Sequence, residues 1–191
     1  MRNIYIYLVA SKSVVSKSIK LFTYDDYTHI GISVDDDLDH FYSFARRYSR
    51  FPVPAGFEKE SLNKGIYQLY PNTACKILSL EIPNDTYLNI KAELEMMHNQ
   101  KDILKYNILG LLLCQTNITI DRKNKFFCSE FVSELLIRHN LLSLNKPPQH
   151  TKPLEIIDLL DSKLVFEGTI AELNLYKKMN NYTKQEIQST L

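Results

Sequence analysis

KFFCSEFVSELL, residues 125–136, is the stretch around which this chain is organised. Its apolar residues recur at spacings of three and four, which is typical of an amphipathic helix with one buried face. Cys128 lies where that helix is expected to begin. The free backbone N–H groups and the positive end of the helix dipole favour a thiolate there over a thiol, whose pKa is ordinarily about 8.5. Cys128 is therefore a candidate nucleophile; the alternative is a small buried apolar residue beside two phenylalanines.

A second candidate site residue lies far upstream, in the segment YTHIGISV at residues 27–34. Apolar residues alternate there with small or polar ones, which predicts a half-buried strand that His29 opens. Cysteine hydrolases place an imidazole beside a thiolate, where it accepts the thiol proton and returns it to the leaving group. A single histidine at a strand end is more often an ordinary surface residue. The prediction therefore depends on the pairing of His29 with Cys128.

Length and composition restrict the class of protein. With 191 residues, 45% of them hydrophobic and 24% charged, the chain can bury the core of one domain. A net charge of +1 without a basic stripe argues against nucleic acid or an anionic membrane as partner. The cysteines Cys75, Cys114 and Cys128 lack CxxC spacing, which argues against a disulfide framework or a zinc ribbon. Because the apolar runs 4–10 and 108–114 are too short to span a bilayer, we expect a soluble, cytoplasmic protein without a cofactor.

The pattern of elements predicts an α+β protein. One domain is expected over residues 1–170, followed by a polar, partly helical tail over 171–191. Residues 46–56, RRYSRFPVPAG, contain prolines and are expected to form a loop that lies over the site. Strands are expected at 4–10, 27–34, 41–45, 66–69, 74–82 and 163–168, and helices at 13–22, from 84, at 108–114, from 128 and at 153–160.

The order of these pieces resembles the circularly permuted branch of the papain-like NlpC-type hydrolases, which is related to lecithin retinol acyltransferase-like enzymes. The resemblance depends on the strand of His29 preceding FFCSEFV at 126–132, whereas ordinary members place the cysteine first. KYNILGL at 105–111 and KPP at 146–148 also resemble permuted amidase-like proteins from bacteria. The resemblance covers residues 1–160. It implies an antiparallel sheet packed against helices that include the nucleophile helix, and a Cys-His hydrolase or acyltransferase acting on peptide, peptidoglycan-fragment or lipid substrates.

The same resemblance implies a third polar residue that orients His29. If the hairpin turns tightly at Asp36 and Asp37, His29 lies opposite Phe44, and His40, four residues down the strand, is the only imidazole partner on that face and is too far for direct contact. If the turn holds a one-residue bulge, Ser43 comes opposite His29 instead. Related permuted proteins usually place a polar residue, often Glu, at the position that Ser43 resembles. We therefore predict Ser43 as the orienting residue, next to the alternative that it is a small packed residue.

Two other classes of function remain open from the sequence. A protein of the same fold that binds but does not turn over its ligand is one, because the orienting residue is not obvious. A zinc site built from His29, His40 and Cys128 is the other, although no fourth ligand and no short ligand spacing supports it. The oligomeric state is not indicated by any pattern.

Overall fold

The apolar N-terminal run RNIYIYLV forms β1 (Arg2–Val9), which lies in the middle of the sheet. It pairs antiparallel with β2 (His29–Ser33) on one side and with β5 (Ala74–Ile82) on the other. Neighbours on both edges and both faces explain why an apolar run is needed here. The structure is a computed structural model that describes residues 1–10, 27–48, 51–114, 116, 118 and 122–189. The helix predicted at 13–22 lies outside these residues.

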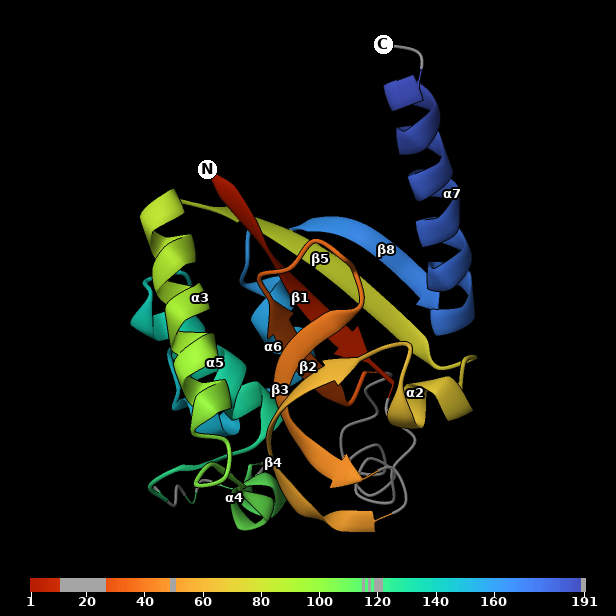
Figure 1. Ribbon diagram of the computed structural model, residues 1–191. Coiled ribbons are helices and arrows are strands. Elements are labelled where there is room, and N and C mark those ends of the chain that lie inside the picture. Colours follow the sequence, from red (N-terminus) through yellow and green to blue (C-terminus); the bar gives the residue numbers. More distant parts are fainter. Residues whose placement is uncertain (11–26, 49–50, 115, 117, 119–121, 190–191) are drawn as a thin grey trace.

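One eight-stranded sheet with the order β7-β6-β4-β3-β2-β1-β5-β8 forms the centre of the molecule (Figure 1). Its pairs are antiparallel except for β6 with β7, so the sheet is mixed and the predicted α+β class is confirmed. The remaining elements are β3 (His40–Tyr48), β4 (Phe51–Ser61), α2 (Gly65–Leu69), α3 (Asn84–Asn99), β6 (Lys105–Tyr106), α4 (Ile108–Leu113), β7 (Lys125–Phe126), α5 (Cys128–Arg138), the 3-10 helix η1 (Pro148–His150), α6 (Pro153–Asp158), β8 (Lys163–Thr169) and α7 (Ile170–Ser189).

The two faces of the sheet carry separate apolar clusters. On one face, α3, α5 and α6 cover the larger cluster, to which Ile90, Phe131 and Ile156 contribute from the helices. On the other face, a smaller cluster contains Tyr7 and Phe41 together with residues of α2 and the first turn of α7. Tyr176 still packs on Phe166 of β8, and the later part of α7 extends away from the sheet (Figure 1). Among the described helices, none combines the length and the apolar character needed to cross a membrane.

The β3–β4 hairpin is where the sequence prediction fails. Within the range 46–56, which was expected as a loop, residues 46–48 belong to β3 and residues 51–56 to β4, and β4 pairs with β3 from Phe51 to Ser61. The strand predicted at 66–69 is the short helix α2 instead. The prolines in β4 favoured the prediction of a loop. The pairing of β4 with β3 decides the conformation instead, and no local sequence signal reveals this pairing.

The helix that begins at Cys128 was predicted correctly. α5 begins at Cys128, and its residues Phe131, Val132, Leu135 and Leu136 are buried against the sheet. Leu141 N–H donates to the carbonyl of Leu136 across the helix end, where Asn140 takes the left-handed conformation expected of a terminal asparagine. β5 also matches the predicted range 74–82. The sheet face and the first turn of α5 are thereby fixed relative to one another.

Candidate functional site

Cys128 is the first residue of α5 and is held at the base of the helix against β2 and β3. Phe127 precedes the helix in an extended conformation, and its backbone N–H donates to the carboxylate of Glu130 at 3.1 Å. The thiol is 4% exposed. Its position at the helix start is the one the sequence predicted.

His29 lies in contact with Cys128 and with a residue that the sequence analysis missed. Its Nε2 is 2.7 Å from Oε1 of Glu60, and its side chain also hydrogen-bonds to Cys128. Because Nε2 is engaged by the carboxylate, Nδ1 is the ring nitrogen left for the thiol. Glu60 comes from β4, whose register places it opposite Phe41. The structure thus brings a thiol, an imidazole and a carboxylate together from three separate elements.

Electrostatics favour a charged imidazole at this site. Burial alone would lower the pKa of His29, but the charge of Glu60 and the hydrogen bonds to Cys128 and Glu60 raise that pKa to about 10. An imidazolium between a carboxylate and a thiol stabilises the thiolate form of the thiol. At neutral pH the site therefore holds a charged imidazole beside the sulfur of Cys128.

Gly31 makes room for the aromatic ring that packs beside His29. The Phe41 ring stacks on Tyr7 with centroids 4.9 Å apart and lies edge-on to the His29 ring at 6.2 Å. A Cβ at Gly31 would lie 2.3 Å from Cδ2 of Phe41 and 2.9 Å from the carbonyl oxygen of Tyr42. Only glycine at position 31 therefore leaves room for the Phe41 ring against the strand that carries His29.

The structure corrects the prediction that Ser43 orients His29. Ser43 is fully buried on β3 and its hydroxyl donates to the carbonyl of Ile30 at 2.8 Å. Ile32 on β2 pairs with Tyr42 on β3, and the two strands are antiparallel. Three residues back along β2 and three residues forward along β3, His29 therefore comes opposite Ala45, and not opposite Ser43 or Phe44. Both registers considered from the sequence differ from the observed one. The side chain that meets His29 is the Glu60 carboxylate on the next strand.

His40 does not reach the site either. Its Nδ1 lies 2.5 Å from Oδ2 of Asp37, at the turn between β2 and β3. Asp37, Asp39 and His40 have ligand atoms within 4.8 Å of one another, and in the described part of the chain no other trio of His, Cys, Asp or Glu does. The zinc site proposed from His29, His40 and Cys128 is therefore not assembled.

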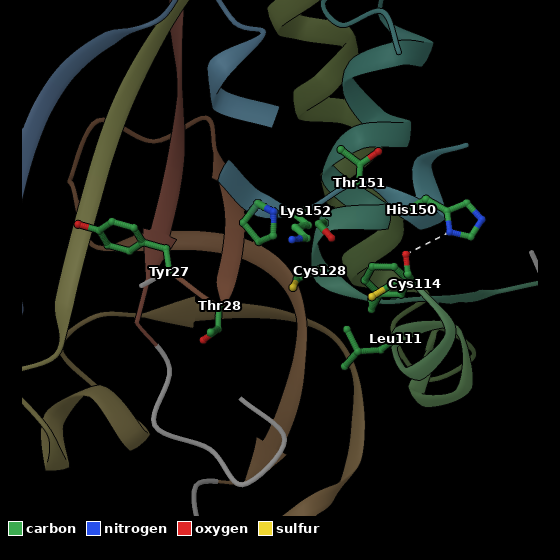
Figure 2. A pocket seen from close by; sticks show the side chains of 11 residues that line it. Tyr27, Thr28, Leu111, Cys114, Cys128, His150, Thr151 and Lys152 are labelled. Carbon is green, nitrogen blue, oxygen red and sulfur yellow. Dashed lines mark hydrogen bonds between the residues drawn. The ribbon is translucent and has the colours of Figure 1, made fainter. Parts of the chain in front are cut away.

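A pocket that opens to solvent lies beside Cys128. The Cys128 sulfur lies between Thr28 and the pair Leu111 and Cys114 (Figure 2). The full lining is Tyr27, Thr28, Leu111, Cys114, Phe127, Cys128, Ser129, His150, Thr151, Lys152 and Pro153. A mostly apolar lining with the thiol at its wall fits an apolar acyl or side-chain group next to the reacting bond.

Glu130 holds the first turn of α5 to α4. Its carboxylate accepts from Phe127 N–H and, at 3.4 Å, from the amide of Asn107, whose own Oδ1 accepts from Gly110 N–H. Burial raises the pKa of Glu130 to about 7 in spite of these hydrogen bonds, which lower it. α4, which supplies Leu111 and Cys114 to the pocket, is thus tied to the helix of the nucleophile.

Comparison with known proteins gives a fold but not a family. No protein-family model and no curated protein matches the chain. A solved structure does. It is described as the crystal structure of metalloprotein yiiX from Escherichia coli O157:H7, DUF1105, and matches with a TM-score of 0.56 and 14% identity over 88% of this chain and 98% of that one. At this identity the similarity shows a shared fold alone.

These comparisons overturn the assignment to the permuted NlpC-type family. The matching structure is described as a metalloprotein of DUF1105, and no hydrolase family model recognises the sequence. The motif FFCSEFV and the strand of His29 are short and are compatible with more than one family. What stands is the α+β fold and the geometry around Cys128.

Brief alkylation should distinguish the three thiols. We expect iodoacetamide at neutral pH to modify Cys128 first, because the His29 imidazolium stabilises its thiolate. Burial raises the pKa of Cys75 to about 12 and also raises that of Cys114, so both should stay protonated. Peptide mapping by mass spectrometry measures the three rates. Faster labelling of Cys75 or Cys114 than of Cys128 would contradict the assignment.

Proposed function

We propose that this protein is a cysteine hydrolase or acyltransferase that acts on amide or ester bonds of a small-molecule, peptide or lipid substrate. The observation that carries the proposal is the contact series Cys128–His29–Glu60, with 2.7 Å between the imidazole and the carboxylate. A thiol, a base and an acidic residue that orients the base are the groups that nucleophilic acyl transfer needs.

In the proposed reaction the Cys128 thiolate attacks the carbonyl carbon, and the carbonyl electron pair moves onto oxygen. The backbone N–H of Cys128, at the helix start, is available to bind that oxygen. The His29 imidazolium then gives its proton to the leaving amine or alkoxide, which leaves a thioester on Cys128. Water or an acceptor attacks the thioester while His29 takes its proton, and the product acid or the new ester departs.

The pocket supports a substrate whose acyl side is apolar. Leu111, Phe127 and Pro153 line the pocket next to the sulfur, and Lys152 also belongs to the lining. Amide and ester substrates share the same tetrahedral chemistry, so the groups at the site are consistent with both.

The test is a screen of amide, ester and thioester substrates with apolar acyl groups, with Cys128→Ala as the blank. We expect turnover by the wild-type protein and a loss of at least about a hundredfold in the variant, the size of a general acid–base or nucleophile contribution. Cys75→Ala is the matched control, because it removes a buried thiol that lies outside the pocket. Equal turnover by wild type and Cys128→Ala would contradict the proposal that Cys128 is the nucleophile. A binding module of the same fold would then be the remaining candidate function.

A further inference from the structure

The carboxylate that meets His29 is itself held by a tyrosine. Tyr67 lies on α2 and its hydroxyl donates to Oε2 of Glu60 at 3.1 Å, while Oε1 of the same carboxylate meets His29 at 2.7 Å. Both oxygens of Glu60 are therefore occupied. A carboxylate held at both oxygens is restricted in its rotation, and the direction in which it presents Oε1 to the imidazole is fixed.

The backbone after β4 is shaped to bring Tyr67 back to Glu60. Gly65 takes a φ of 60°, in the left-handed region that glycine adopts without strain. The chain turns there and begins α2, which lies at the end of β4 (Figure 1). Two residues later Tyr67 is 5% exposed, with its ring 6.2 Å from the Phe41 ring that also packs on His29. Tyr67, Phe41 and His29 therefore form one packed face around the Glu60 carboxylate.

Tyr67 is suited to act as a permanent donor. Burial and the neighbouring Glu60 charge raise the pKa of Tyr67 well above its ordinary value, so that the phenol stays neutral. A neutral O–H donating to a carboxylate favours the ionised form of that carboxylate. The other titratable or charged groups that act on Tyr67 or Glu60 are His29 on β2, Arg46 on β3, Tyr106 on β6 and Cys128 on α5.

We propose that Tyr67 is a positioning residue for the Cys128–His29 pair: its hydroxyl holds the Glu60 carboxylate turned toward the imidazole. The inference rests on the proposed function in taking Cys128 and His29 as the reactive pair. Loss of the Tyr67 hydroxyl leaves Oε2 of the partly buried Glu60 without this donor. The carboxylate then stabilises the imidazolium less well, and the thiolate of Cys128 forms at higher pH.

The test measures the rate of Cys128 alkylation by iodoacetamide between pH 5 and 9 in the full chain, and needs no substrate. We expect Tyr67→Phe to move the rising limb of the profile to higher pH, with a rate at pH 6 lower by up to roughly tenfold, the scale of one hydrogen bond to a charged group. Glu60→Gln should move the limb further in the same direction. Tyr87→Phe is the matched control, because it removes a buried hydroxyl that donates to the Val34 carbonyl at 2.9 Å; it should leave the limb in place.

A profile of Tyr67→Phe that coincides with that of Tyr87→Phe, while Glu60→Gln is shifted, overturns the inference and leaves the proposed function standing. If the profile of Tyr67→Phe is shifted but the wild-type protein turns over no substrate, the inference is supported and the proposed enzymatic function is contradicted. If Cys128 does not react in the wild type at any of these pH values, both fail.

A second measurement covers the case in which Tyr67→Phe does not fold. Replacing Tyr67 by 3-fluorotyrosine keeps the ring and the hydroxyl but makes the hydroxyl a stronger donor. The rising limb should then move to lower pH, and NMR titration of the His29 ring should show a higher pKa than in the wild type. An unchanged limb and an unchanged His29 titration in a folded fluorinated protein overturn the inference.

Discussion

Glu60→Gln is expected to slow alkylation of Cys128 at pH 7 by about a hundredfold and to reduce any turnover by at least as much. The amide carries no charge, so that the burial of His29, which lowers its pKa, is no longer outweighed by the carboxylate. The imidazole becomes neutral at pH 7, and the thiolate of Cys128 loses its cation. The rate should be measured as loss of free Cys128 over time by mass spectrometry.

Glu58→Gln is the control for this prediction. Glu58 lies on the same strand and pairs with Arg47, with Nε and Oε1 2.9 Å apart, and with Lys101, so the variant removes the same charge without touching His29. We expect its alkylation rate to match the wild type. Equal rates in Glu60→Gln and Glu58→Gln would show that the carboxylate does not control the imidazole.

The same pair predicts a pH dependence of folding stability. The pKa of His29 is about 10 in the folded protein and about 6.5 in an unfolded chain. A group whose pKa is higher in the folded protein than in the unfolded chain stabilises the fold fully at pH values below its unfolded pKa. This contribution is lost as the pH rises through the folded pKa. The contribution of His29 to the free energy of unfolding should therefore decrease between about pH 6.5 and pH 10. Urea unfolding at a series of pH values measures this decrease, which should be absent in Glu60→Gln.

Gly31→Ala is expected to destabilise the protein by about 1–3 kcal/mol or more, because it overpacks the core. The new Cβ would lie 2.3 Å from the Phe41 ring and 2.9 Å from the Tyr42 carbonyl oxygen, and neither group has free space into which to move. Because the Phe41 ring also packs on His29, the variant should additionally slow Cys128 alkylation. Urea unfolding and the alkylation rate measure the two effects.

A second substitution and a control make the Gly31 prediction specific. Phe41→Leu in the Gly31→Ala background removes the ring carbons that clash, so the double variant should be more stable than the sum of the single effects predicts. Gly168→Ala is the control in another strand, since its Cβ would meet the Glu172 carboxylate, the end of a flexible side chain, at 2.9 Å and Phe166 at 3.0 Å. Equal losses in Gly31→Ala and Gly168→Ala, or additive effects in the double variant, would contradict the packing argument.

Local patterns in the sequence were enough for part of the fold and for two residues of the site. The strand at 74–82 and the helix from Cys128 follow from periodicity within a single segment, and the position of His29 at a strand start does so as well. The pairing of Cys128 with His29 came from chemistry, because the two residue types at these places have a known joint use.

Glu60 and Tyr67 were missed because their roles depend on contacts between segments. Glu60 stands in the run FEKES, 57–61, whose charges resemble those of a solvent-exposed strand or loop. Its partial burial follows from the pairing of β4 with β3, which the prolines at 52 and 54 concealed, and from the turn at Gly65 that brings α2 back. Phe57 and Leu62 are buried on opposite faces of the sheet, so the segment between them shows no alternating pattern that would have outweighed the prolines.

The candidate site draws on β2, β4 and α5, and α5 follows the two strands in the chain. His29 and Glu60 therefore leave the ribosome before Cys128 is made. The three groups can meet only after α5 has docked onto the sheet, so the proposed contact series is one of the last features that the chain can form during synthesis.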